Sequence, residues 1–300
     1  MASTKDRLFD KDTLKHLRLP FSFFLLPIFI FAISQSDTIN LWNTIIVFIV
    51  LHFFIYPASN IYNSFMDKDT GSIGGLKNPP PVTPKLYTVS IIFDSIGLVL
   101  SLFVNKELFL LMAIYIAVSK VYSWHKIRLK KYAILSWLIV MSFQGAYTYL
   151  LTNMSSTNDF SFHWINDKNK FAMLLATLLI GGLYPITQIY QHKEDSERGD
   201  KTISLLLGIN GTFILTALLF IASCSIAFLY FTIFYDLGYF IRFMICLFPI
   251  TLYFLTWVIK CWKKPEKADF SHTMRMTLIS SICMIICFIY LLILNQPIVY

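Results

Sequence analysis

Charged residues are scarce in this 300-residue chain. They make up 14% of the sequence, whereas a soluble domain typically carries about 25%. A water-soluble fold of this size has too much surface to cover with so few charges. The shortage therefore excludes a soluble enzyme, a disordered regulator and a secreted disulfide-rich scaffold.

The sequence also lacks common catalytic signatures. It contains no G-x-S-x-G, no G-x-x-x-x-G-K and no G-x-G-x-x-G motif, which argues against hydrolase, P-loop and dinucleotide-binding chemistry. The 5 cysteines form an odd number without C-x-x-C spacing and lie in or beside apolar runs, so we expect them to be apolar helix residues.

What the chain has instead is long apolar runs. Hydrophobic residues make up 56% of it, and the runs lack the alternating pattern of a membrane β-barrel. Nine of them are long enough, or nearly so, to cross a bilayer core that needs about 20 helical residues. We predict an all-α polytopic membrane protein, a single integral-membrane domain over residues 1–300, with nine transmembrane helices around a central cavity. The predicted spans are Leu19–Ser34, Leu41–Ser59, Leu86–Val104, Leu108–Trp124, Tyr132–Thr152, Phe171–Tyr190, Gly211–Tyr235, Tyr239–Ile259 and Thr273–Leu294.

The distribution of Lys and Arg predicts the orientation. Twenty of the 25 basic residues lie in the N-terminal segment and in alternate connections, and connections on the other side hold only four. Basic loops are typically cytoplasmic. We therefore predict a cytoplasmic N-terminus and an outside C-terminus, and we attribute the net charge of +8 to the bilayer rather than to nucleic acid.

Two of the predicted cytoplasmic connections resemble each other. The segment Ile61–Gly71 reads IYNSFMDKDTG, and Ile189–Gly199 reads IYQHKEDSERG, 128 residues later. The shared pattern is I-Y-amide-x-x-x-D-x-acid-x-G, within helix–loop units near residues 42–85 and 171–210. Internal repeats in membrane proteins often build a site where related halves meet.

The repeated segments predict a cation and phosphate site. An amide and an acid four residues apart share one helix face, as Asn63 does with Asp67 and Gln191 with Asp195. Oxygen ligands of this kind suit Mg²⁺, which is typically shared with substrate phosphates. The acidic residues that we predict to bind Mg²⁺ are Asp67, Asp69, Glu194, Asp195 and Glu197. Basic residues that we expect on the same side to neutralise a diphosphate are Lys77, Lys126, Arg128, Arg198 and Lys201.

These residues resemble the UbiA-type intramembrane prenyltransferase superfamily, whose members are nine-helix proteins with aspartate-rich loops after helices two and six. The first family motif, N-D-x-x-D-x-x-x-D, matches Asn63 and Asp67 only. The second, D-x-x-x-D-x-x-x-G-x-x-T, has Gln191 in place of its first acid and keeps Asp195, Gly199 and Thr202. A third element, Y-x-x-x-K, matches Tyr122 and Lys126 and is followed by Arg128 and Lys130.

The resemblance implies the function. It implies Mg²⁺-dependent transfer of an isoprenyl group from a prenyl diphosphate donor to a lipophilic or aromatic acceptor within the membrane, with Asp67, Asp195, Lys126 and Tyr122 as the catalytic residues. Asn63, Lys77, Arg128, Gln191, Arg198 and Lys201 are the expected substrate-binding residues. Three of the five family aspartates are absent, which leaves the number of metal ions open.

Two alternatives remain at this point. A terpene cyclase on the same scaffold would capture the cation with the donor's own double bond. A transporter or non-catalytic membrane protein would place ionisable residues at mid-membrane depth. We find almost no such residues in the predicted spans apart from His52, Lys120 and Arg242.

Overall fold

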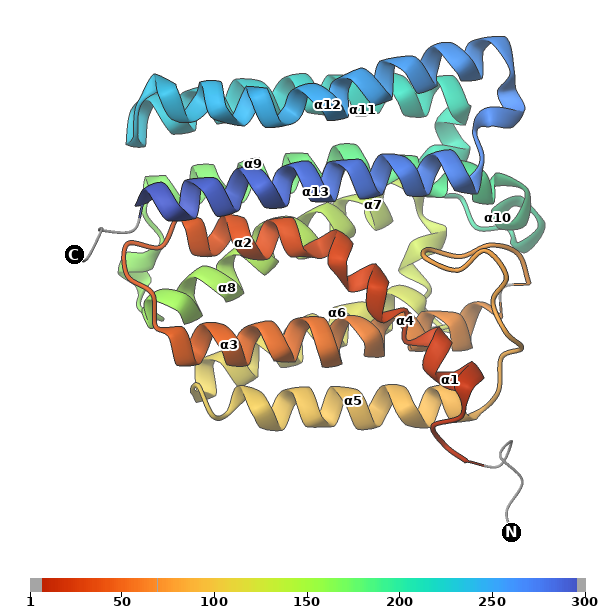
Figure 1. The fold of residues 1–300 in the computed structure, drawn as a ribbon. Helices are drawn as coiled ribbons and strands as arrows, with labels where there is room; N and C mark the ends of the chain where they lie inside the picture. Colours follow the sequence, from red (N-terminus) through yellow and green to blue (C-terminus); the bar gives the residue numbers. More distant parts are fainter. Residues whose placement is uncertain (1–6, 69, 296–300) are drawn as a thin grey trace. The chain divides into compact units, whose positions relative to one another are not determined.

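The computed structural model describes residues 7–68 and 70–295, and every regular element in these ranges is helical (Figure 1). The all-α prediction is confirmed for this part of the chain. Seven of its helices or continuous helical runs are long and apolar enough to cross a membrane, as expected for an integral multi-pass protein. They are Lys11–Ser34, Leu41–Asp67, Ala133–Thr157, Asp167–Arg198, Ile203–Phe234, Leu237–Lys263 and Phe270–Asn295.

The predicted count of nine spans is not confirmed. The two remaining predicted spans do form helices, α5 (Lys85–Ser101) and α6 (Lys106–Ser123). They are 17 and 18 residues long, and α6 includes the charged residues Lys106, Glu107 and Lys120. Both are therefore at or below the length and apolarity that a spanning helix needs. The predicted orientation stays a prediction, and Tyr300 lies outside the described residues.

The chain divides into two compact units, so that the predicted single domain also stays a prediction. Unit 1 comprises Met1–Phe23 and Leu41–Lys130, and unit 2 comprises Phe24–Asn40 and Lys131–Tyr300. Each predicted acidic segment belongs to a different unit.

Unit 1 is a small helical bundle. Its helix α4 packs against both α5 and α6. The π-helical turn η3 links α3 to α4 without interrupting the run, and Pro57 lies directly after η3, in the first turn of α4. The elements of unit 1 are α1 (Lys11–His16), most of η2 (Leu19–Leu25), α3 (Leu41–Ile49), η3 (Val50–Ile55), α4 (Tyr56–Asp67), α5 and α6, and it ends within η4 (Leu129–Lys131).

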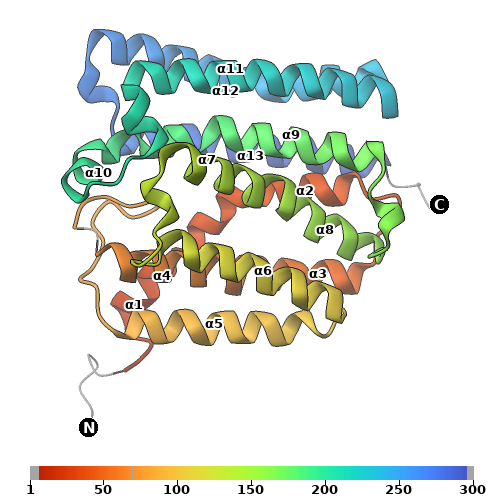
Figure 2. The same ribbon diagram turned by 180° about the vertical axis from the view of Figure 1, so that it is seen from behind.

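Unit 2 holds the longer helices. Helix α9 packs against α11, and α13 packs against α2 and α12 (Figure 2). The elements are α2 (Leu26–Ser34), α7 (Ala133–Met141), η5 (Ser142–Tyr147), α8 (Thr148–Thr157), η6 (Phe162–Trp164), α9 (Asp167–Leu183), η7 (Pro185–Gln191), α10 (His192–Arg198), α11 (Ile203–Phe234), α12 (Leu237–Lys263), η8 (Pro265–Lys267) and α13 (Phe270–Asn295).

Polar side chains set where several of these helices begin. Asn105 caps α6 by accepting a hydrogen bond from the Leu108 N–H at 2.7 Å. Asn166 caps α9 in the same way. Asp236 caps α12 with two bonds, the shorter at 2.6 Å from the Gly238 N–H. Each cap satisfies backbone donors that the first turn of a helix leaves unpaired.

Unit 1 also buries an ion pair. Lys120 Nζ on α6 lies 2.7 Å from Asp94 Oδ2 on α5, and 4.1 Å from the centroid of the Tyr62 ring on α4. Their side chains are only 17% and 9% exposed. The sequence analysis considered Lys120 as an isolated span residue and overlooked Asp94, its partner. Buried charges of opposite sign need each other, because neither keeps its water shell.

In unit 2, Gly145 allows η5 to approach α9 closely. A Cβ atom added there would lie 2.6 Å from the Thr177 Cα and 2.8 Å from the Ala176 carbonyl oxygen, both backbone atoms. Small residues commonly permit such approaches between membrane helices.

We expect Gly145→Ala to lower the free energy of unfolding by about 1–3 kcal/mol, because the backbone of α9 must move to admit the methyl group. Thermal melting in detergent measures the effect. Gly181→Ala is the matched control, since its Cβ would meet the flexible end of Met141 at 3.0 Å. Equal melting temperatures for the two variants would contradict the expectation.

Candidate functional site

The first acidic segment ends in a buried carboxylate. Asp67 is the last residue of α4, and Lys68 follows in the left-handed conformation that terminates the helix. Lys130 Nζ lies 2.5 Å from Asp67 Oδ2, and Arg128 Nη2 lies 3.8 Å from Oδ1. The Asp67 side chain is only 3% exposed. Among the described residues, Oδ1 has no hydrogen-bond partner, so one oxygen remains for a further ligand.

The two cations come from the turn that follows α6. Arg128 has a φ of 48°, a left-handed conformation that costs energy in a residue with a Cβ, and its N–H bonds to the Trp124 carbonyl at 2.6 Å. The turn leads into η4, which carries Lys130. The sequence analysis proposed Arg128 as a site residue and noted Lys130 only as a follower of the third family element. The signal available in the sequence was that Lys130 lies two residues after Arg128 in an extended or turning segment.

A seam of small polar side chains joins α4 to α6 beside this carboxylate. Asn63, one turn before Asp67, donates through Nδ2 to Ser123 Oγ at 2.9 Å. One turn further back, the hydroxyls of Ser59 and Ser119 are hydrogen bonded. Asn63 therefore helps to fix α4 against the helix that precedes the two cations.

The other residues predicted in unit 1 differ in their exposure. Lys126 is exposed, with its Nζ 5.6 Å from the centroid of the Trp124 ring. Lys77 is exposed in the connection after α4, and Tyr122 is half-buried near the end of α6. Asp69 lies outside the described residues.

The connection that carries Lys77 is tied to the start of the chain. Arg18 donates to the Asn60 and Gly74 carbonyls at 2.9 and 3.3 Å, and His16 Nε2 lies 2.9 Å from the Pro80 carbonyl oxygen. The bonds to Gly74 and Pro80 satisfy backbone acceptors in a glycine- and proline-rich stretch without helices, and the bond to Asn60 ties Arg18 to α4. The N-terminal residues therefore hold the loop that follows the first acidic segment.

The second acidic segment is a short helix, α10, closed by a glycine turn. Gly199 adopts a φ of 73°, which a residue with a Cβ rarely takes, and ends the helix. The turn brings Thr202 back so that its hydroxyl donates to Asp195 Oδ2 at 3.2 Å, and the Asp200 N–H bonds to the Asp195 carbonyl at 2.9 Å. Asp195 is buried. The D-x-x-x-G-x-x-T spacing thus has a local structural reason.

The remaining predicted residues of unit 2 differ in their contacts and exposure. Glu194 and Arg198 form an ion pair at 2.6 Å across one turn of α10. Glu197 and Lys201 are exposed, and Gln191 is half-buried at the end of η7.

The sequence analysis missed a polar cluster that fixes α10 to α11. His192 Nε2 lies 2.7 Å from Ser204 Oγ, and Gln188 Oε1 accepts a hydrogen bond from the Ser204 N–H at 3.4 Å. Ser204 Oγ is in turn 3.0 Å from Thr212 Oγ1, across the non-helical Gly208 of α11. The helix break separates Ser204 from Thr212 in a way that helical periodicity does not predict.

The repeat is also longer than the segments first compared. Tyr56-Pro57 precedes the first acidic segment, and Tyr184-Pro185 precedes the second at the same spacing of 128 residues. Each proline lies in the first turn of a new helical element, α4 or η7. The shared start is consistent with a common origin for the two segments, whereas their ends differ because α4 stops at Asp67 and α10 continues to Arg198.

The donor atoms present fit a loosely held Mg²⁺. No cluster of three or more His, Cys, Asp or Glu side chains suited to a metal ion occurs within residues 7–68 and 70–295. Mg²⁺ does not require one, since it is usually bound through one or two carboxylates together with waters and substrate phosphates. Asp67, whose Oδ1 accepts no hydrogen bond from the described residues, is a donor of this type.

The sequence matches a known family over most of its length. The model of the UbiA prenyltransferase family matches residues 24–282. The chain belongs to the UbiA prenyltransferase family. The resemblance seen in the sequence is thereby confirmed, and no curated protein matches the chain in sequence.

Solved structures of UbiA homologues share the fold. A UbiA homologue from Archaeoglobus fulgidus bound to DMAPP and Mg²⁺ matches with a TM-score of 0.66 and 17% identity, over 94% of this chain and 99% of that one. A UbiA homologue from Aeropyrum pernix K1 gives 0.65 and 14%, over 94% and 98%. A structure described for digeranylgeranylglyceryl phosphate synthase gives 0.60 and 19%, over 93% and 98%.

Proposed function

We propose that this UbiA-family protein transfers an isoprenyl group from a prenyl diphosphate to a lipophilic or aromatic acceptor within the membrane, and that the reaction requires Mg²⁺. Family membership supports prenyl transfer in general. Homologue structures that contain GPP or DMAPP together with Mg²⁺ support the donor class and the metal.

The observation that carries the proposal is the grouping of Asp67 with Lys130 and Arg128. A carboxylate and two cations, all largely removed from water, are the groups needed to bind a metal–diphosphate complex. Arg128 offers a planar set of donors that matches phosphate oxygens, and Lys130 offers a compact point charge. Asp67 is ion-paired with both cations in the structure.

The residues have separate roles when the allylic C–O bond of the donor breaks. The bonding electron pair leaves with the diphosphate, and Lys130 and Arg128 stabilise that added negative charge. Bound Mg²⁺ supplies Lewis-acid stabilisation of the same oxygens. Asp67 orients the two cations and offers Oδ1, which accepts no hydrogen bond from the described residues. Attack by the acceptor on the allylic carbon forms the new bond, and the proton that the acceptor loses goes to the departing diphosphate.

The second acidic segment has a matching role in the proposal. We propose Asp195, whose buried carboxylate accepts a hydrogen bond from Thr202, as the second metal-associated aspartate. Asp69, Glu194 and Glu197 are proposed as accessory metal-associated acids, and Asn63, Lys77, Gln191, Arg198 and Lys201 as substrate-binding residues. We keep Lys126 and Tyr122 in the proposal on the family element that they match.

Incubation of the purified protein with Mg²⁺, prenyl diphosphates of several chain lengths and a lipid extract tests the function. We expect new lipids whose masses increase by that of the prenyl group of the donor supplied, and no such lipids when EDTA replaces Mg²⁺. A cyclised hydrocarbon or alcohol formed without any acceptor would show that the protein catalyses cyclisation and not transfer. Unchanged diphosphates with every donor would overturn the proposal.

We expect Lys130→Ala to weaken binding of a prenyl diphosphate by at least about tenfold, because one charge-assisted contact is worth about 1.5–3 kcal/mol. Isothermal titration with a non-hydrolysable donor analogue and Mg²⁺ measures it. Lys126→Ala is the matched comparison, since Lys126 is exposed. An unchanged Kd in Lys130→Ala would remove this lysine from the site, and a loss in Lys126→Ala would confirm the role that the family element gives it.

A further inference from the structure

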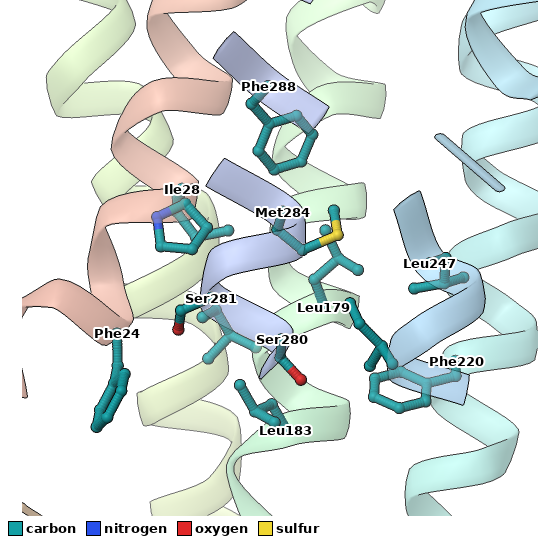
Figure 3. A pocket seen from close by; sticks show the side chains of 13 residues that line it. Phe24, Ile28, Leu179, Leu183, Phe220, Leu247, Ser280, Ser281, Met284 and Phe288 are labelled. Carbon is teal, nitrogen blue, oxygen red and sulfur yellow. The ribbon is translucent and has the colours of Figure 1, made fainter. Parts of the chain in front are cut away.

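Unit 2 contains an apolar cavity at the level of the middle of α13. It lies between α13 and α9, with α2 on one side and α11 and α12 on the other (Figure 3). Phe24 and Ile28 line the α2 side, and Phe220 and Leu247 line the opposite side. The volume of the cavity is about 50 Å³. The lining is apolar apart from two adjacent serines of α13, Ser280 and Ser281.

The hydroxyls of these two serines have no hydrogen-bond partner among the described residues. The residues are 6% and 1% exposed. Figure 3 shows the Ser280 hydroxyl on the side of Phe220 and the Ser281 hydroxyl on the side of Phe24, so that they lie on both flanks of the cavity. Two other helix hydroxyls are paired, since Ser223 donates to the Leu219 carbonyl at 2.8 Å and Thr277 to the Thr273 carbonyl at 2.9 Å. The Thr273 hydroxyl, near the start of α13, also has no partner among the described residues.

The depth of the serines makes this unusual. Ser280 is the eleventh residue of α13, about 15 Å from its first residue at 1.5 Å per residue, and about 22 Å of helix follows. The bilayer core offers no water to satisfy polar groups there. Buried polar groups are normally paired, and an unpaired hydroxyl beside a cavity indicates an occupant that supplies the partner.

A second space adjoins this cavity. A groove of about 740 Å³ runs between α11 and α12, and it shares Phe220 and Leu247 with the lining of the cavity. Its other lining residues are mainly apolar, including Phe228, Phe240 and Phe254. The hydroxyls of Ser225 and Thr251 in the groove already bond to carbonyls of their own helices. The groove therefore suits a hydrocarbon chain and offers no strong polar contact.

We propose that unit 2 binds a neutral lipid, with its hydrocarbon chain in the α11–α12 groove and a hydroxyl or carbonyl oxygen at Ser280 and Ser281. Phe220 and Leu247 form the boundary that the head of the lipid passes. The two serine hydroxyls each form one hydrogen bond with the polar end, and the narrow apolar cavity excludes a charged or bulky head group. The site is independent of the proposed transfer reaction.

Photolabelling in phosphatidylcholine nanodiscs tests the site. The probes are a diazirine-bearing hexadecanol and the matching hexadecane, followed by mass spectrometry of the labelled peptides. We expect hexadecanol to label α11, α12 or α13 at about tenfold lower concentration than hexadecane, as two modest hydrogen bonds predict. Ser280→Ala/Ser281→Ala is expected to abolish that difference.

The controls separate binding from folding. Ser223→Ala removes a hydroxyl that is already satisfied within α11, and it is expected to preserve the preference for the alcohol. The double variant is expected to melt no lower than the wild type, because it removes two unsatisfied buried groups. Equal labelling by alcohol and alkane in the wild type, or a preference that survives in the double variant, would overturn the proposal, including the case in which water alone fills the cavity. Neither readout depends on prenyl transfer.

Discussion

Asp67→Asn and Asp195→Asn are each expected to lower Mg²⁺-dependent prenyl transfer by at least about 100-fold, the scale seen when a transition-state-stabilising group is removed. The amide keeps the size of the side chain and removes its charge. In Asp67→Asn, the 2.5 Å ion pair with Lys130 is lost as well as the metal donor. In Asp195→Asn, the amide oxygen still accepts from Thr202, so the local turn is preserved. Turnover measured against Mg²⁺ concentration shows both the lower rate and the weaker metal dependence.

Asp236→Asn is the matched control for these substitutions. Asp236 caps α12, and asparagine caps helices equally well, so that only a surface charge changes. A cooperative melting transition in each of the three variants establishes that they fold. Asp67→Asn is expected to melt below the wild type, because Lys130 and Arg128 lose their buried partner. Full Mg²⁺-dependent activity in both Asp67→Asn and Asp195→Asn would refute the role of the paired acidic segments.

Replacing one member of the Asp94–Lys120 pair is expected to destabilise the protein by about 3–5 kcal/mol, because the partner is left as an uncompensated buried charge. The pair joins α5 to α6, and Lys120 also contacts the Tyr62 ring of α4. Asp94→Leu and Lys120→Met should therefore each melt well below the wild type. The double variant replaces both charges by apolar groups of similar volume and should recover most of the stability.

A double-mutant cycle on melting in detergent checks this expectation. The interaction free energy should be favourable and several times the few tenths of a kcal/mol found for distant sites. Lys106→Met provides a comparison on the same helix, since its side chain is 83% exposed. Additive losses in the double variant would show that the two charges act independently.

The amino-acid sequence was sufficient for the class of fold and for the family. Apolar runs of membrane-spanning length and the shortage of charge predict a helical membrane protein, because the bilayer imposes these features on any spanning helix. The spacing of Asn63, Asp67, Asp195 and Thr202 was enough to indicate UbiA, and the family model confirms it. Length and hydropathy were less decisive for α5 and α6, which are short and place the charged Asp94 and Lys120 side chains between them.

The partners of the site residues depend on tertiary contacts. Lys130 is 63 residues from Asp67, and only the packing of α4 against α6 brings the turn after α6 to the carboxylate. Asp94 and Lys120 likewise form an ion pair only because α5 packs against α6. Helical periodicity states which face of one helix is apolar, but not which side chain of a second helix will meet it. Membrane-spanning segments follow from local composition, whereas ion pairs require two distant segments to meet at one depth, and that is decided by the packing of the whole unit.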